Sequence, residues 1–438
     1  MRRAAVVGAG GAGLAAAQAL AARNVDFVVF EAGSGLGGNW RYGNDSGLSS
    51  GYQSLRANTS RHHTAFRCFA IGPSRSLFLD HTEMLGYLER FADHFDLRRR
   101  IRFRTRVTAV RPVDGEWEVT ANGTRERFSD VIVASGFNSV PRYPEFPGSF
   151  TGLQLHTHDY RTPEPFADRD VVVVGLGCSA AELACDIRTV ARSVTLAARS
   201  GSWVVPRRVG VIPVDWFDTR VGSRLSINAR RRLFVPLFRL AAGPRSGTGL
   251  PKPDHRLGEK PITVSDELLP LLRTHRIVAC APVVELRGDR VGLADGTERV
   301  ANALLYGTGY RTAFDFLPPE ADAPTNQHAP LYRGVLSLAV PGLFFVGIVF
   351  GHGALIPVME AQANWVADVV TGRLALPGPD AMRRSVAQDA AFRARHFDPR
   401  FGFIWDRLPY IRALESESAQ VRRRPGRIAA RAADATVG

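Results

Sequence analysis

Lysine is almost absent from this chain of 438 residues, and cysteine is rare. Two lysines, Lys252 and Lys260, leave 54 of the 56 basic residues as arginine. The cysteines contain no C-x-x-C pair and are too few for a disulfide framework, so we expect reduced thiols in a cytoplasmic protein. There are four of them: Cys68, Cys178, Cys185 and Cys280.

Long apolar runs are also missing. No window reaches the roughly 18 uninterrupted apolar residues that a membrane-spanning helix requires. The N-terminus, MRRAAVVGAGGAGLAAAQAL, has a basic start and a small apolar run that superficially resembles a signal peptide. Four glycines within residues 8–13 interrupt that run and argue against a continuous apolar helix. We therefore expect a soluble protein without a membrane partner.

Positive charge is plentiful but spread along the chain. A net charge of +14 would by itself permit nucleic-acid binding. The arginines are scattered except for runs such as 98–100, 230–232 and 422–424, which solvated surfaces explain better. A basic surface would equally suit anionic cofactors. We expect no nucleic-acid partner, and the length predicts two or more domains.

A glycine-rich loop follows the first apolar run, which predicts a buried strand over residues 4–7. A helical stretch and a second strand at 26–30 come next, and Glu31 then stands where an acid can accept hydrogen bonds from a ribose hydroxyl. This order is typical of a dinucleotide-binding unit, and the later pair Gly37-Gly38 resembles FAD-binding flavoproteins with two such domains. The loop itself fits G-x-G-x-x-G: Gly8, Ala9, Gly10, Gly11, Ala12 and Gly13.

A second loop of this kind begins at Gly175, after four consecutive valines. It reads G-x-G-x-x-A through Gly177 and Ala180, and a helix from 180 to about 189 and a strand at 193–199 follow. The strand ends at Arg199, where an NAD site usually has an acid, so a 2′-phosphate and therefore NADP are favoured. We interpret Cys178 as a small loop residue, with a reactive thiol as the alternative. The next arginines, Arg207 and Arg208, either add to the phosphate site or lie exposed.

Two histidines lie between the loops, in the stretch SFTGLQLHTHDYR at residues 149–161. On an extended chain, His156 and His158 would point to the same side and could hold a metal. A connector between two domains is the alternative. No third ligand is identified and both neighbouring loops are typical of nucleotide sites, so we expect no metal.

The same stretch carries the most specific motif of the chain. It matches F-x-G-x-x-x-H-x-x-x-Y/F at Phe150, Gly152, His156 and Tyr160, and so resembles the fingerprint of flavin-containing monooxygenases. Related Baeyer–Villiger monooxygenases usually carry tryptophan at the last position, so Tyr160 favours the branch that oxygenates nitrogen and sulfur. Other segments similar to the family are 52–61, 131–137, 249–257, 306–317 and 341–365, so the resemblance runs from about residue 4 to 414.

The resemblance implies FAD and NADP as cofactors, and O₂ and a small-molecule substrate as reactants. NADPH would reduce the flavin, which would form a C4a-hydroperoxide with O₂ and pass the distal oxygen to an amine or a sulfide. Asn58 is the expected catalytic residue, and a loop-capping role is its alternative. The residues expected at FAD are Gly8, Ala9, Gly10, Gly11, Ala12, Gly13, Glu31, Gly38, Asn39, Trp40, Asn58, Thr59, Val107 and Gln362. Those expected at NADP are Gly175, Gly177, Ser179, Ala180, Ala181, Glu182, Arg199 and Ser200.

We expect an α/β protein with two dinucleotide-binding, Rossmann-like and doubly wound domains, the NADP domain being inserted into a discontinuous FAD domain. Segment 204–260 is expected to cover the active-site cleft. The expected division is an N-terminal FAD-domain segment at 1–150, a fingerprint linker at 151–164, the NADP domain at 165–305, a C-terminal FAD-domain segment at 306–414, and a disordered basic tail at 415–438.

Residues 62–80, with His62 and His63, match the family poorly and leave the substrate unassigned. Three other functions stay open. The first is Baeyer–Villiger-type oxygenation of a ketone. The second is a reductase that passes electrons to a protein disulfide or iron–sulfur partner, which the missing cysteine pair weakens. The third is a non-catalytic redox sensor that keeps FAD. The sequence also leaves open whether the chain forms a homo-oligomer.

Overall fold

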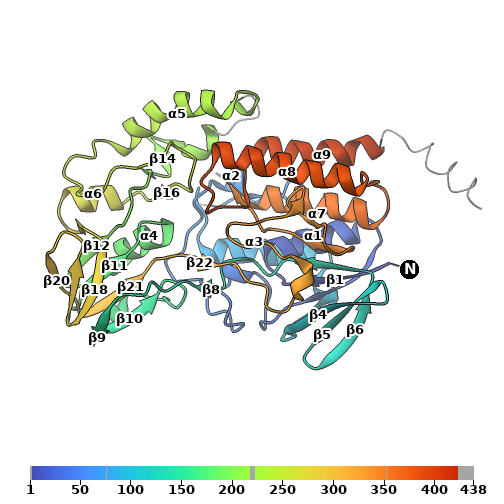
Figure 1. Cartoon of the computed structure of the whole chain (residues 1–438), viewed down its shortest axis with the longest axis horizontal. Coiled ribbons are helices and arrows are strands. Elements are labelled where there is room, and N and C mark those ends of the chain that lie inside the picture. Colours follow the sequence, from blue (N-terminus) through green and yellow to red (C-terminus); the bar gives the residue numbers. More distant parts are fainter. Residues whose placement is uncertain (1, 75, 218–221, 352, 423–438) are drawn as a thin grey trace, which may run out of the picture.

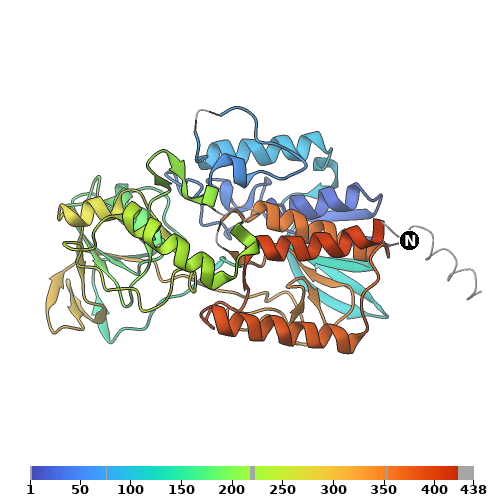
Figure 2. The ribbon, with the colours of Figure 1, turned by 90° about the horizontal axis from the view of Figure 1, so that it is seen from above.

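The computed structural model describes residues 2–74, 76–217, 222–351 and 353–422, and these form two lobes side by side (Figure 1). The lobe on the right in Figure 1 contains both ends of the described chain, and the lobe on the left contains the middle. Figure 2, seen from above, shows helix α5 (Ile227–Ala242) running from the left lobe toward the other one.

Both ends of the chain contribute to the sheet of the first lobe. Its strand order is β23-β24-β25-β7-β1-β2-β3. The early strand β1 pairs in parallel with β2 and β7, and β7 pairs in parallel with the late strand β25. A discontinuous first domain is thereby confirmed. The bounds are β1 Arg3–Val7, β2 Asp26–Phe30, β3 Ile101–Arg102, β7 Asp130–Val133, β23 Leu331–Tyr332, β24 Leu336–Ser337 and β25 Leu343–Phe345.

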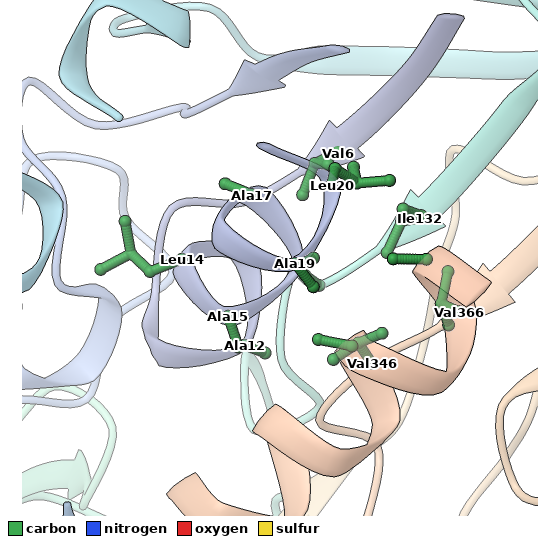
Figure 3. Packing of buried hydrophobic residues seen from close by; sticks show 14 of the residues in the cluster. Val6, Ala12, Leu14, Ala15, Ala17, Ala19, Leu20, Ile132, Val346 and Val366 are labelled. Carbon is green, nitrogen blue, oxygen red and sulfur yellow. The ribbon is translucent and has the colours of Figure 1, made fainter. Parts of the chain in front are cut away.

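The central strand β1 is buried on both faces, as expected for a parallel sheet. Val6 packs with helices α1 (Gly11–Ala21), α3 (His81–His94) and α7 (Ile356–Val370). Alanines let α1 approach α7 closely, and Figure 3 shows Ala12 and Ala19 of α1 near the helix that carries Val366. Val7 packs on the other face with an antiparallel meander, β4 (Val107–Val113), β5 (Glu116–Ala121) and β6 (Thr124–Phe128).

The second lobe contains a parallel sheet with the strand order β10-β21-β11-β12-β17. Helices α4 (Cys178–Ile187) and α6 (Leu268–Arg273) pack on one face. The order β20-β19-β18-β9 describes a small mixed sheet that packs on the other. The bounds are β9 Gly148–Phe150, β10 Leu153–His156, β11 Asp170–Val174, β12 Ser193–Ala197, β17 Val278–Cys280, β18 Val283–Gly288, β19 Arg290–Leu293, β20 Glu298–Val300 and β21 Ala303–Tyr306.

Two Rossmann-like units in an α/β protein are confirmed, but the doubly wound detail is wrong. In each lobe helices cover one face of the parallel sheet and strands cover the other. The reason is the connection to the last inner strand: the chain passes from β3 to β7 through the meander β4–β6, and from β17 to β21 through β18–β20. Each of these connections is a β-layer in place of a helix.

The chain crosses between the lobes as two short strands, β8 (Val140–Pro141) and β22 (Tyr310–Arg311), which pair antiparallel. The stretch expected as a linker at 151–164 contains the edge strand β10 of the second sheet. Even β9, which lies before that stretch, pairs with β18 of the second lobe. The strand pairing therefore places the fingerprint inside the second lobe.

Three further long helices are α5, α8 (Pro379–His396) and α9 (Arg407–Arg422). The expected disorder from residue 415 is wrong as far as 422, because Glu417 accepts hydrogen bonds from Arg333 and Trp365. The rest of that tail, 423–438, lies outside the described residues. Among the helices of the described ranges, none is long and apolar enough to cross a bilayer. The remaining elements are α2 Arg61–Thr64, β13 Val204–Val205, β14 Arg208–Val209, β15 Ile212–Pro213, β16 Thr263–Val264, β26 Phe350–Gly351 and β27 Ile404–Trp405.

Candidate cofactor sites and the cavity between them

The first glycine loop turns from β1 into α1 under tight steric limits. Gly8 has φ of +103°, and a Cβ there would lie 2.8 Å from the Ala134 carbonyl oxygen. A Cβ at Gly13 would overlap the carbonyl oxygen of Gly8, so strand and helix approach as closely as the dinucleotide-binding pattern requires.

The N-terminus of α1 is open to a ligand. Its N-cap, Gly10, makes no side-chain capping bond, and the first turn holds no acidic residue. The first N–H groups of the helix and its partial positive charge are therefore available to an anion. Gly10 and Gly11 both line the adjoining cavity.

Glu31 lies directly after β2 at the edge of this loop. One carboxylate oxygen accepts from the Ala9 N–H at 2.7 Å, and the other from the Gly33 N–H at 2.8 Å. Burial raises the pKa of Glu31, and the two N–H groups oppose that shift. A carboxylate has about four acceptor positions, so two remain for hydroxyl donors in the cavity, which Glu31 lines.

One continuous cavity of about 1030 Å³ begins at this loop. It is large enough for an extended cofactor together with a small molecule, because typical ligand pockets have volumes of about 300–1,000 Å³. Most residues expected at FAD line it: Gly8, Gly10, Gly11, Ala12, Glu31, Gly38, Asn39, Trp40, Asn58, Thr59 and Val107.

Three residues expected at FAD do not line the cavity but lie behind the residues that do. Ala9 and Gly13 form the turn and the helix packing described above. Gln362 is fully buried in α7; its amide oxygen accepts from the Gly347 N–H at 2.8 Å, and its amide nitrogen donates to the Tyr410 hydroxyl at 2.9 Å. Gly347 itself lines the cavity, so Gln362 supports the wall from outside.

The second glycine loop repeats this geometry between β11 and α4. Gly175 has φ of +120°, and a Cβ there would overlap the Gly307 carbonyl oxygen. A Cβ added at Gly307 would lie 2.5 Å from that of Ala180, which explains how alanine fits at the third position of this loop. A Cβ at Gly177 would meet no atom within 4 Å, and α4 has no side-chain cap or acidic residue in its first turn.

Arg199 and Ser200 are exposed just after β12, which ends at Ala197. Within the described ranges, Arg199 has no hydrogen-bond or ion-pair partner. Ser179 is half-buried and Ala181 is buried within α4. Cys178 lines the cavity, so the second loop reaches the same space as the first. Burial raises the pKa of the Cys178 thiol to about 11, which keeps it protonated and unreactive.

A largely buried ionic network joins helix α4, which follows the second loop, to residues 52–58. The guanidinium of Arg207 pairs with Glu182 of α4 and also with Asp266, at 3.3 Å. It donates to the Asn58 side-chain oxygen at 3.1 Å, while the Tyr52 hydroxyl donates to Glu182 at 2.8 Å. The alternative of an exposed Arg207 is therefore wrong, whereas Arg208 is exposed. Burial raises the pKa of Glu182, and Arg207 opposes that shift.

The fingerprint residues are packing and positioning groups of the second lobe. A Cβ at Gly152 would overlap the Asn302 carbonyl oxygen and lie 2.7 Å from the Phe150 ring. Tyr160 is fully buried, and its hydroxyl donates to Asp186 at 2.7 Å. His156 is also fully buried, and its Nδ1 accepts from the His158 N–H at 3.0 Å.

The histidine pair belongs to no metal cluster within the described ranges. The His156 ring packs against Tyr143 and Tyr310, with ring centroids 5.3 Å apart in each case. Burial lowers the pKa of His156 to about 4, so its imidazole is neutral at physiological pH.

Sequence reasoning missed the residues that cover the cavity. Segment 204–260 lies over it as expected, but none of its side chains was predicted to line the cavity: Arg207 was assigned to a phosphate site or the surface, and the run 230–232 to solvated surface. Both charged and apolar side chains line it there: Arg207, Asp215, Ile227, Arg230, Arg231, Phe234, Phe238 and Leu257. Helix α5 supplies five of these, and its three consecutive arginines and Pro236 hid its apolar periodicity.

Residues 1–430 match the family model described as flavin-binding monooxygenase-like. Dimethylaniline monooxygenase (N-oxide-forming) 2 of Mus musculus is 31% identical over 408 residues, covering 87% of this chain and 76% of that protein. The structure of S-allyl-L-cysteine S-oxygenase from Allium sativum is 26% identical with a TM-score of 0.72, covering 95% of this chain and 88% of that one. NADP⁺-bound cyclohexanone monooxygenase from Rhodococcus sp. Phi1 shares the fold at 20% identity, with a TM-score of 0.72 and coverages of 96% and 98%.

Proposed function

The chain belongs to the flavin-binding monooxygenase-like family, and we propose from this premise that it oxygenates an amine nitrogen or a sulfide sulfur of a small molecule. It is an FAD-dependent NADPH monooxygenase. For a sulfide, one atom of O₂ adds to sulfur, and the other leaves as water, which takes a hydride equivalent (two electrons and one proton) from NADPH and a second proton from solvent. The names of the mouse N-oxide-forming relative and the garlic S-oxygenase support nitrogen and sulfur as the atoms that react.

The observation that carries this proposal is the continuous cavity from the first glycine loop past Asn58 to the second loop at Cys178. The open N-terminus of α1 would hold the pyrophosphate of FAD, and the two free acceptor positions of Glu31 would take a ribose hydroxyl. When bound, FAD supplies the redox chemistry, because it accepts electrons from NADPH and activates O₂.

Asn58 would act as a hydrogen-bond donor to the reacting groups. Its side-chain oxygen is taken by Arg207, and this fixes the amide orientation because arginine can only donate. The amide nitrogen is then the polar atom of this side chain that remains to donate a hydrogen bond into the cavity, which Asn58 lines. Arg207 is a positioning residue in this proposal.

NADPH would bind to the second lobe through the open N-terminus of α4. The unfilled space beside Gly177 leaves room for a pyrophosphate, and the exposed Arg199 would pair with the 2′-phosphate. The residues of segment 204–260 would exclude water from the region between the cofactors.

The test is the identity of the product. Purified chain loaded with FAD should consume NADPH in air and convert amines to N-oxides or sulfides to sulfoxides, as measured by mass spectrometry. Conversion of a cyclic ketone to a lactone without amine or sulfide oxidation would replace the proposal with Baeyer–Villiger chemistry. NADPH consumption without oxygenation of any substrate would contradict both.

A further inference from the structure

Asp215 stands in the wall of the cavity, within the short 3-10 helix η4 (Val214–Phe217) of the covering segment. Its side chain is only 5% exposed. One carboxylate oxygen, Oδ2, accepts from the Ser60 N–H at 2.7 Å. The other, Oδ1, is buried and has no hydrogen-bond partner. A buried carboxylate with a bare oxygen in a ligand cavity is incomplete without a donor or a cation.

The other acidic groups that line the cavity are either partnered or, in the case of Asp315, exposed. Glu31 accepts two backbone N–H groups, and Asp406 forms an ion pair with Arg230. For Asp215, no arginine or lysine in the described ranges forms an ion pair. His63 lies nearby, but its Nδ1 is 3.6 Å from Oδ2, the oxygen that Ser60 already occupies. Oδ1 therefore remains the free acceptor.

The neighbouring positive charge of Arg207 does not meet this need. Arg207 also lines the cavity, but its guanidinium is held by Glu182 and Asp266. Because Glu182 is largely buried and would lose its counter-charge if Arg207 moved, Arg207 remains paired with Glu182. A cation for Asp215 must come with the ligand.

We propose that Asp215 binds an ammonium group of the substrate, so that the preferred substrates are aminoalkyl sulfides. This inference rests on the proposed function and names its substrate class. The ammonium is not the group that is oxygenated, because a protonated nitrogen has no lone pair. The sulfur lone pair forms the new S–O bond with one atom of O₂. The other atom leaves as water, which takes a hydride equivalent (two electrons and one proton) from NADPH and a second proton from solvent, and the ammonium keeps its protons.

Asp215 lies beside the segment that carries Asn58. Ser60, which holds Oδ2, is two residues after Asn58, and two Cα–Cα steps span at most about 7.6 Å. Asp215 and Asn58 both line the cavity, so a short aminoalkyl sulfide is the first substrate to test.

The experiment compares 2-(methylthio)ethylamine with methyl propyl sulfide, which differ only by an ammonium in place of a methyl group. Sulfoxide formation is measured with the FAD-loaded full chain, as wild type and as Asp215→Asn. We expect the wild type to prefer the ammonium sulfide. The variant should lose about tenfold or more in kcat/KM for that substrate and stay within about twofold for the neutral one, as expected when a charged hydrogen bond is lost. Asp254→Asn, which removes an exposed carboxylate of the same segment outside the cavity, should change neither value.

Three outcomes would overturn the inference. The first is equal kcat/KM of the wild type for both sulfides, a comparison that needs no variant to fold. The second is an equal loss for both sulfides in Asp215→Asn but not in Asp215→Glu, which keeps the charge. The third is a higher KM for NADPH with unchanged sulfide preference, which would assign Oδ1 to the nucleotide.

A separate binding measurement distinguishes failure of this inference from failure of the proposed function. If the wild type oxygenates neither sulfide, the proposed function fails for sulfides. Titration of the flavin absorbance with 2-(methylthio)ethylamine then still tests whether Asp215 binds the ammonium group. Binding by the wild type that is weakened about tenfold in Asp215→Asn supports the ammonium site, and equal binding overturns it.

Discussion

Arg207 connects helix α4 to the proposed catalytic residue at the level of single side chains. It pairs with Glu182 of the helix after the second loop and donates to Asn58 of the segment after the first. Loss of the arginine would leave Glu182 buried without its counter-charge, at a cost of about 3–5 kcal/mol. Nothing in the sequence WVVPRRVG separates this buried arginine from the exposed Arg208 beside it, because only the tertiary partners differ.

Asn58→Ala is expected to uncouple NADPH consumption from oxygenation. Without the amide donor, turnover should be diverted to hydrogen peroxide, and the yield of oxygenated product per NADPH should fall about tenfold or more. Product and peroxide are measured together with NADPH consumed. An unchanged yield would return Asn58 to a loop-capping role.

Arg199→Ala is expected to impair the use of NADPH but not that of NADH. Because the guanidinium would pair only with the 2′-phosphate, kcat/KM for NADPH should fall about 10- to 100-fold, while the value for NADH stays within about twofold. Arg192→Ala, at the other end of β12 and also exposed, is the matched control and should affect neither. Equal losses for NADPH and NADH in Arg199→Ala would remove Arg199 from the phosphate site.

Among the elements, the strand–loop–helix units could be predicted from sequence because their geometry demands particular residues. Gly8 and Gly175 adopt positive φ, and Gly13 leaves no room for a Cβ. Helix α5 could not be predicted in this way, since the buried Arg231 falls on the face that periodicity expects to be apolar. Similarly, the Ala/Arg-rich composition of the tail from about residue 415 suggested disorder, but Glu417 is held by partners 52 and 84 residues away.

Gly13→Ala tests the packing of the first unit. Its Cβ would overlap the backbone of the preceding turn, so strand and helix must separate, at a cost of about 1–3 kcal/mol or more. Urea unfolding should show this loss, and FAD content should fall with it. Gly72→Ala, where a Cβ meets no atom within 4 Å, is the control and should leave both unchanged. Normal FAD content and stability in Gly13→Ala would contradict the predicted loop geometry.

At the scale of the whole molecule, the two lobes share one cavity and are joined by the paired crossing strands β8 and β22. The sequence predicted two dinucleotide units and the insertion of one into the other, because each unit carries its own local pattern. The boundary between the two lobes could not be predicted from such a local pattern. The fingerprint resembles a connector in sequence, yet its strand β10 pairs with β21, about 150 residues later. The position of segment 204–260 over the cavity likewise depends on contacts between residues that are far apart in the sequence.

The central claim is that this shared cavity lets electrons from NADPH reach FAD and lets one oxygen atom reach the substrate. A single-turnover experiment tests it most directly: FAD-loaded protein is reduced with NADPH without oxygen, then mixed with ¹⁸O₂ and an aminoalkyl sulfide. We predict loss of the oxidised-flavin absorbance in the first step and, in the second, a sulfoxide that carries one ¹⁸O atom. A flavin that NADPH does not reduce, or reoxidation that yields only hydrogen peroxide, would contradict the account.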